Sequence, residues 1–473
     1  MILARSLPLI VLFAGCSFST YDYTPCSVNA ECRDAFGFGS VCGDEGFCET
    51  APMNERCQTT FPEGLTLPVD PSTTLLIGTV FDHSKSAHVA RYRSIELAAK
   101  QLTDKEGLEG MLPAVIDCDI EEGLYEDELD AEGAAVATAT WLADTVGVPA
   151  IIGPASSSHV EAAYLAIKDF GTLMISPSAT SPSLTALDAS VATDSEPGRL
   201  WRTAPPDSLQ GLAIATDMND RGINKVAVIY QIGAYGEGLD TVFSETFADL
   251  GHQAVSFPFD NETARSEAIT TAGDPSNSFD EVLFISSDTA DITSFLITAG
   301  GSANYADKSV FLTDTARTVD VLTAAAASSA FFPNVRGTGP SLPSGFVYNS
   351  FSDSYRGYFG EEVSSYSYTA QSFDAAWMVF YGHAWAYYNE DGFTGTNIAR
   401  GLRKLSTGGD VDVLPSEWPT VRQQFAERIA VNINGASGPL NYDPSTEETE
   451  APIDVWIITA SADGFDIVDV YNP

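Results

Sequence analysis

The sequence has few basic residues. Its 473 residues include 23 Lys and Arg against 65 Asp and Glu, and the formal net charge is −42. Nucleic acids and anionic membrane surfaces are bound through basic patches, so the charge argues against both as partners. The acidic residues are scattered along the chain, which is typical of a well-solvated acidic surface rather than of a specific cation site.

Long apolar runs are absent after the N-terminus, where no segment approaches the length of about 18 residues needed to cross a membrane. The first residues, "MILARSLPLIVLFAGC", combine Arg5, an apolar run and the small residues before Cys16, which is typical of an export signal. This segment resembles a bacterial lipoprotein signal. The resemblance implies that residues 1–15 are removed, that Cys16 is lipidated, and that the protein is held in the cell envelope by lipid alone, at the periplasmic face or the outer membrane.

Catalytic and cofactor motifs are also missing. The serines of "GPASSSH" lack the glycines of G-x-S-x-G, there is no S-x-x-K, and "YGEGL" is not G-x-G-x-x-G. His159 follows the serines on a predicted helix and would point away from Ser158. His83 and His88 in "DHSKSAH" lack converging acids at metal-binding spacing. We therefore expect neither an enzyme nor a metal or cofactor.

Six cysteines remain beyond Cys16, and an even number in an exported chain suggests disulfides. Four of them are spaced C-x5-C-x9-C-x5-C in a segment with little apolar surface, and they are Cys26, Cys32, Cys42 and Cys48. The segment resembles short EGF-like modules of bacterial surface lipoproteins. A zinc site is the alternative, although the paired C-x2-C spacing is lacking. Cys57 and Cys118 are left over, and we predict that they pair and tie the module, residues 16–57, to the main body.

Residues 58–72, "QTTFPEGLTLPVDPS", contain three prolines and are interpreted as a linker. After them, short apolar runs alternate with amphipathic stretches of helical period. The predicted strands are "TLLIGTVF", "LPAVIDCD", "VPAIIGPA", "GTLMISPS", "NKVAVIYQ", "FDEVLFIS", "KSVFLTD" and "GFVYNS". Such alternation predicts an α/β protein with parallel sheets covered on both faces, arranged as two doubly wound lobes.

Two neighbouring predicted strands end in clusters of hydroxyls. Ser156, Ser157 and Ser158 follow the first strand, and "SPSATS" at residues 176–181 ends the next. Ligands of open parallel sheets collect at this edge, where helix N-termini present free N–H groups. The clusters are either ordinary helix caps or the two walls of a carboxylate site, and we expect Ser158 to be the cap.

The region "IIGPASSSHVEAAYLAIKDFGTLMISPSATSPSLT" resembles the signature of type I periplasmic binding proteins of the leucine/isoleucine/valine-binding family. Three further motifs agree in order, "QIGAYGEGLDTVF", "SYTAQSFDAAWMVFYGHAWA" and "NINGASGPLNYDP". The resemblance covers about residues 73–473. It implies two hinged lobes, one of residues 73–203 and 343–430 and the other of residues 204–342 and 431–473.

The resemblance also implies a ligand site and its residues. Ser156, Ser157, Ser178 and Thr180 would hold a carboxylate, Tyr235 would contact the ligand from the second lobe, and an acid would take an ammonium group. The full set is Phe81, Ser156, Ser157, Ser178, Ala179, Thr180, Tyr235 and Asp314, with Thr315 as the alternative to Asp314. The expected ligand is a small amino-acid-like or amide molecule, delivered by a monomeric protein to an ABC permease. The rival interpretation is an outer-membrane lipoprotein that binds and regulates an envelope protein, or a ligand sensor.

Overall fold

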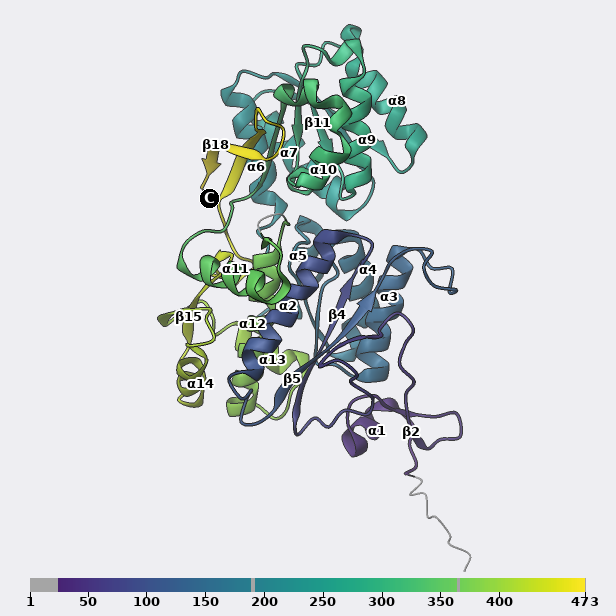
Figure 1. The fold of residues 1–473 in the computed structure, drawn as a ribbon, viewed down its shortest axis with the longest axis vertical. Coiled ribbons are helices and arrows are strands. Elements are labelled where there is room, and N and C mark those ends of the chain that lie inside the picture. The colour runs from purple at the N-terminus through teal and green to yellow at the C-terminus, as the bar shows by residue number, and fades with distance from the viewer. Residues whose placement is uncertain (1–23, 189–191, 364–365, 473) are drawn as a thin grey trace, which may run out of the picture.

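The structure is a computed structural model and describes residues 24–188, 192–363 and 366–472. The signal segment and Cys16 lie outside the described residues. Figure 1 shows two α/β lobes stacked along the long axis of the molecule, with a small N-terminal module at the far end of the first lobe. We call the lobe next to the module lobe 1 and the other lobe 2.

Lobe 1 is built on a six-stranded sheet in the order β3-β5-β4-β6-β7-β8. All neighbouring strands are parallel except β3, which pairs antiparallel to β5 at the edge. Strand β4 is buried over almost its whole length, as expected for a parallel strand covered on both faces. The strands are β3 Thr59–Phe61, β4 Thr74–Phe81, β5 Leu112–Asp119, β6 Ala150–Ile152, β7 Leu173–Ser176 and β8 Leu200–Arg202.

Lobe 2 repeats this plan in a seven-stranded sheet ordered β10-β9-β11-β12-β13-β17-β18. Strands β9 to β13 are parallel, and the last two strands of the chain add antiparallel to the edge. The strands are β9 Lys225–Gln231, β10 Gln253–Phe259, β11 Glu281–Ile285, β12 Ser309–Leu312, β13 Val335–Pro340, β17 Ile453–Ile458 and β18 Phe465–Tyr471. In both lobes the first parallel strand lies between the second and the third, β4 between β5 and β6 and β9 between β10 and β11.

Helices cover both faces of each sheet. Lobe 1 has α2 Ser86–Thr103, α3 Ala131–Thr140 with the π-helical turn η1 Trp141–Val146, α4 Ser157–Ile167, α5 Pro182–Asp188, α11 Phe346–Phe359, α12 Thr369–Asn389, α13 Gly395–Leu402 and α14 Trp418–Ala426. Lobe 2 has α6 Asp207–Asp220, α7 Ala234–Asp249, α8 Glu262–Gly273, α9 Thr289–Gly300, α10 Val319–Ala324 and several 3-10 turns. Helix α12 is buried on all sides from Thr369 to Ala386, so it forms the centre of the lobe 1 core.

Three connections join the lobes, after β8, after β13 and after the two-residue strand β16 Gly438–Pro439. The last one differs from the predicted boundary at residue 431. Strand β15 Val431–Gly435 pairs with β14 Gly409–Asp412 in a small sheet, and Val431 and Ile433 belong to the lobe 1 core. The chain therefore returns to lobe 2 only at β17.

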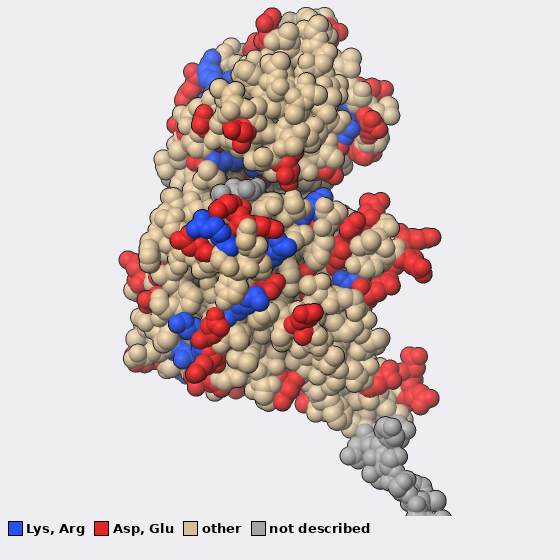
Figure 2. Space-filling view, in the orientation of Figure 1, with Lys and Arg blue, Asp and Glu red and all other residues tan. Residues whose placement is uncertain are grey.

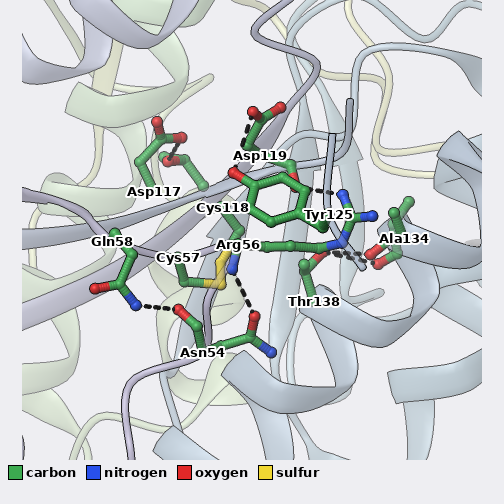
Figure 3. Close-up of a disulfide and its surroundings, with 12 residues drawn as sticks. Asn54, Arg56, Cys57, Gln58, Asp117, Cys118, Asp119, Tyr125, Ala134 and Thr138 are labelled. Carbon is green, nitrogen blue, oxygen red and sulfur yellow. Dashed lines mark hydrogen bonds between the residues drawn. A yellow bond between two sulfur atoms is a disulfide. The ribbon is translucent and has the colours of Figure 1, made fainter. Parts of the chain in front are cut away.

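The N-terminal module holds two disulfides, Cys26–Cys42 and Cys32–Cys48, around α1 Asn29–Phe36 and the hairpin β1 Ser40–Cys42 and β2 Cys48–Thr50. The predicted third pair, Cys57–Cys118, is also present. Figure 3 shows this bond joining the end of the module to β5, with Arg56 and Tyr125 beside it. Since Cys118 lies in a core strand, the module is fixed directly to the body of lobe 1.

The structure differs from two secondary-structure predictions. The segment "GFVYNS" begins helix α11 and is not a strand, because Val347, Phe351 and Tyr355 recur every four residues and bury one helix face. The expected linker contributes β3, which pairs with β5. No helix within the described ranges is long and apolar enough to cross a membrane. Figure 2 shows acidic side chains distributed over both lobes on one face of the molecule.

Candidate ligand-binding cleft

A cavity of about 600 Å³ lies between the lobes and is lined from both of them. Its walls are the segments that follow β4 and β6 in lobe 1 and β9, β11 and β12 in lobe 2. In each sheet the strand order changes direction between the first and the third parallel strand, β4 and β6 in lobe 1 and β9 and β11 in lobe 2. Ligands of such sheets bind in the crevice at this point. The fold thus places two such crevices face to face.

The serine cluster begins helix α4. Ser156 is the N-cap residue in extended conformation, and its side chain caps no helix N–H. The Ser157 hydroxyl oxygen is buried and accepts hydrogen bonds from the Thr180 and Ser181 amides, both at 3.2 Å. The expectation that Ser158 caps the helix is wrong, because its hydroxyl accepts a hydrogen bond from the Ala234 amide of lobe 2 at 3.1 Å.

The second hydroxyl cluster lies beside the first but is largely used within lobe 1. The Ser178 hydroxyl donates to the Ala155 carbonyl at 2.9 Å, and Ser178 lines the cleft. Ala179 and Thr180 are 1% exposed and do not line it. Thr180 contacts the buried Asp207, whose amide donates to the Thr180 carbonyl at 2.8 Å, and burial raises the pKa of Asp207 well above its usual range.

Phe81 lies at the end of β4 and is completely buried. Its ring makes an edge contact with His88, with ring centroids 6.1 Å apart, and it belongs to the lobe 1 core rather than to the cleft lining. Of the eight predicted site residues, five line the cleft: Ser156, Ser157, Ser178, Tyr235 and Asp314.

Asp314 and Thr315 both line the cleft, and Asp314 is the buried one. Its Oδ1 accepts hydrogen bonds from the Tyr235 hydroxyl at 2.5 Å and from Gln210 Nε2 at 3.2 Å. Its Oδ2 accepts one from the Tyr368 hydroxyl at 2.6 Å. Burial raises the pKa of both tyrosines well above the usual value, so they act as donors and Asp314 is their acceptor.

Direct contacts join the lobes around the cleft. The Tyr368 bond connects lobe 1 to Asp314 of lobe 2, and the Ser181 hydroxyl donates to the Ala234 carbonyl at 2.6 Å. At Gly238 of the "YGEGL" motif, an added Cβ would lie 2.7 Å from Ser181 Oγ of the opposite lobe. A side chain there would hold the lobes apart, which explains a glycine at this position. The structure is therefore a form in which the lobes touch.

Charged and aromatic residues that sequence reasoning missed also line the cleft. Arg91 of α2 is 8% exposed, and Tyr368 precedes α12. Burial lowers the pKa of Arg91 to about 10, that of His159 to about 4, and that of His88 well below its ordinary value. One sequence signal could have identified Arg91. It lies on the same face of α2 as apolar residues that are buried.

Comparison with known proteins extends these observations. A family model described as "Receptor family ligand binding region" matches residues 90–460. The leucine-, isoleucine-, valine-, threonine- and alanine-binding protein of Pseudomonas aeruginosa is 29% identical over 175 residues. That match covers 36% of this chain and 42% of the relative, so the chain spans less than half of the length of this curated relative.

Solved structures resemble almost the whole chain. A leucine-binding protein of Thermotoga maritima has a TM-score of 0.65 at 20% identity, over 85% of this chain and 99% of that one. The branched-chain amino acid transporter binding protein of Streptococcus pneumoniae with isoleucine has a TM-score of 0.60 at 18% identity, over 84% and 99%. A solute-binding protein of R. palustris with benzoate gives 0.60 at 15% identity, over 85% and 97%. The predicted fold class, that of type I periplasmic binding proteins, is confirmed.

Proposed function

The chain belongs to the family of receptor ligand-binding regions, and we propose that it is an extracytoplasmic solute-binding lipoprotein that captures a small amino-acid-like ligand by hinge closure. The observation that carries this proposal is the cleft of about 600 Å³ whose walls come from the strand ends of two lobes. Its relatives include amino-acid-binding proteins, which supports a role of the same kind.

The mechanism is closure of one lobe over the other. Ligand docks first on lobe 1, where the N-terminus of α4 presents N–H groups and the Ser157 hydroxyl. Lobe 2 then brings Tyr235 and Asp314 over it, and contacts such as Tyr368 to Asp314 stabilise the closed form. Ligand shifts the population of closed molecules because only that form engages it from both sides. An ABC permease would recognise the closed form.

The position of the N-terminal module supports a lipid anchor at Cys16. The module lies at the end of lobe 1 opposite to the cleft (Figure 1). An anchor preceding the module would therefore leave the cleft directed away from the membrane. The module is cross-linked within itself and to β5, so it would act as a firm base.

The same module favours one alternative, an envelope lipoprotein that binds and regulates another protein. A disulfide-rich domain fixed to the far end of lobe 1 adds a surface that a plain solute carrier does not need. Cleft residues such as Arg91 and Tyr368 speak for the solute-binding function, because a docking protein has no use for buried polar groups facing a cavity.

Calorimetric titration tests the proposal directly. The chain from residue 17 onward, produced with its disulfides, is titrated with aliphatic amino acids, short carboxylic acids, amides and urea-like compounds. We expect at least one to bind with micromolar or better affinity, as a ligand held from both lobes should. Absence of binding to every compound, with a cooperative melting transition proving the protein folded, would reject solute binding and leave protein regulation as the function to pursue.

A further inference from the structure

Arg91 is exceptional among the buried arginines of this chain. Among the residues that the structure describes, Arg56, Arg91 and Arg202 are buried. The side chains of Arg317 and Arg403 are 8% exposed, and they pair with Asp454 and Glu447. Arg56 is paired with Asp127 and Arg202 with Glu448. No carboxylate of the described residues forms an ion pair with Arg91. The unpaired cation is the one that lines the cleft.

The Arg91 side chain is held in place but not saturated. Its Nη1 donates to the Ser178 hydroxyl at 3.1 Å, and its Nε donates to the Ser367 carbonyl at 3.1 Å. The guanidinium lies over the Tyr368 ring, 5.2 Å from its centroid. Within the described ranges Nη2 has no hydrogen-bond partner. Neutral contacts thus orient the group, and one edge remains for an anion.

The charge of Asp314 acts on Arg91, but the two side chains form no direct ion pair. A buried cation without a direct carboxylate partner opposes folding, because desolvation disfavours the charged form. Burial lowers the pKa of Arg91 to about 10, and yet the group stays protonated near neutral pH. A carboxylate is the natural complement, since its two oxygens match the guanidinium geometry.

Further donors point to the same region of lobe 1. The Ser157 hydroxyl accepts two amide hydrogen bonds, and its own proton has no acceptor in the described part of the chain. The first N–H groups of α4 have no intrahelical acceptors. Ser178, by contrast, gives its proton to the Ala155 carbonyl and accepts from Arg91, so it orients Arg91 instead of donating to a ligand.

The opposite wall does not require an ammonium group. Both oxygens of Asp314 already accept hydrogen bonds, from Tyr235, Gln210 and Tyr368. Three neutral donors of the protein therefore already bind this carboxylate. The cleft lining also carries other acids, Asp82, Glu121, Glu122, Asp288 and Asp320, whereas its buried arginine, Arg91, lies on lobe 1 and has no direct carboxylate partner among the described residues.

We propose that the cleft selects small carboxylic acids and does not require an α-amino group. The carboxylate of the ligand pairs with Arg91 and accepts a hydrogen bond from the Ser157 hydroxyl. This inference rests on the proposed solute-binding function and makes it more specific. The ligand carboxylate supplies the direct ion-pair partner that Arg91 lacks, and Asp314 serves as a bridge between Tyr235 and Tyr368.

The experiment separates the two ligand groups with matched probes. Leucine, leucinamide and 4-methylpentanoate differ only in the carboxylate or the amine, and benzoate with benzamide makes a second pair. We expect the protein to bind at least one of the acids, and to bind the matching amide at least about 100-fold more weakly, because the amide leaves the guanidinium unpaired. We also expect 4-methylpentanoate to stay within about tenfold of leucine.

Variants assign the effect to Arg91. Arg91→Gln should remove the acid preference and Arg91→Lys should restore part of it, whereas Arg93→Gln on the same helix, whose partner is the surface Glu361, should change nothing. An amide that binds as tightly as its acid, or an Arg91→Gln variant that keeps full affinity for the acid, would overturn the inference while leaving solute binding intact. The comparison of acid with amide needs no variant. Folded protein that binds no probe would overturn both proposals.

Discussion

Arg56 and Arg91 are two buried arginines of lobe 1, and each lies over a tyrosine ring, that of Tyr125 at 4.3 Å and that of Tyr368 at 5.2 Å. Their hydrogen bonds differ. Arg56 binds Asp127 through Nε at 2.6 Å and Nη2 at 2.7 Å, and its Nη1 donates to backbone carbonyls. Arg91 donates only to a hydroxyl and a carbonyl.

The difference separates a structural site from a binding site. At the Arg56 junction (Figure 3), all three guanidinium nitrogens and the adjacent disulfide hold the end of the module against lobe 1. At the cleft, the protein orients a similar group and gives it no direct carboxylate partner among the described residues. Substitutions at the Arg56 junction should lower the free energy of unfolding and leave ligand affinity unchanged. Substitutions at Arg91 should lower ligand affinity and leave the free energy of unfolding almost unchanged.

The largest effect is expected from the double variant Cys57→Ala, Cys118→Ala. The bond closes a segment with a sequence separation of 61, and its loss should lower the free energy of unfolding by about 4 kcal/mol through the greater freedom of the unfolded chain. Urea unfolding measures this change. Ligand affinity should stay within about twofold of wild type. A loss of affinity larger than tenfold in the folded variant would show that the junction and the cleft are coupled.

The same substitution at each arginine tests the comparison most directly. Arg56→Met should lower the free energy of unfolding by about 2 kcal/mol, because Asp127 loses its charged partner but is itself partly exposed and regains water. Arg91→Met should change the stability of the ligand-free protein by less than about 1 kcal/mol, since it removes an unpaired buried charge. Thermal and urea unfolding report both. Equal losses at the two positions would mean that Arg91 is structural.

A smaller effect is expected at the bridge between the lobes, and the tyrosines around Asp314 provide a matched pair. Tyr235 and Tyr368 each donate to the Asp314 carboxylate, but only the Tyr368 bond crosses from lobe 1. Tyr368→Phe should remove about 1.5 kcal/mol from the closed form and increase the radius of gyration of the ligand-free protein in small-angle scattering. Tyr235→Phe should leave that radius unchanged. Expansion in both variants would argue against Tyr368 as a latch.

Much of the fold could be predicted because parallel strands buried on both faces leave a clear sequence pattern. The predicted strands at residues 74–81 and 112–119 coincide with β4 and β5. The pattern failed where polar residues occupy strands. Strand β18 at the sheet edge contains two acidic residues among its apolar ones and was missed. Strand β15 was assigned to the wrong lobe because its pairing is set by tertiary contacts.

The site was predictable only in part. Resemblance of motifs led to Ser156, Ser157, Tyr235 and Asp314, which all line the cleft. It could not reveal that the Thr180 side chain hydrogen-bonds Asp207, because the direction of a side chain depends on neighbours far apart in sequence. Arg91 was missed for a related reason. A single arginine on a helix is normally solvated, and its isolation from carboxylates becomes visible only when α2, the Ser178 loop and the segment before α12 are brought together.

The smallest expected effect concerns pH, and it tests whether Arg91 is the cation that acts in the cleft. His88 and His159 also line it. Burial and the charges of Arg91 and Lys85 lower the pKa of His88 well below its ordinary value. Burial and the charge of Lys85 lower the pKa of His159 to about 4. The Asp82 amide donates to His88 Nδ1 at 3.3 Å, which fits a neutral ring. Both histidines are therefore uncharged near neutral pH, and acidification toward pH 5.5 does not protonate them.

The affinity for a carboxylic acid should stay within about twofold between about pH 5.5 and about pH 7.5, whereas a histidine of ordinary pKa beside the anion would strengthen binding as the pH falls. Calorimetry in buffers of different ionisation enthalpy measures both the affinity and the protons taken up. Tenfold tighter binding at the lower pH, with proton uptake, would transfer the role of cation from Arg91 to a histidine.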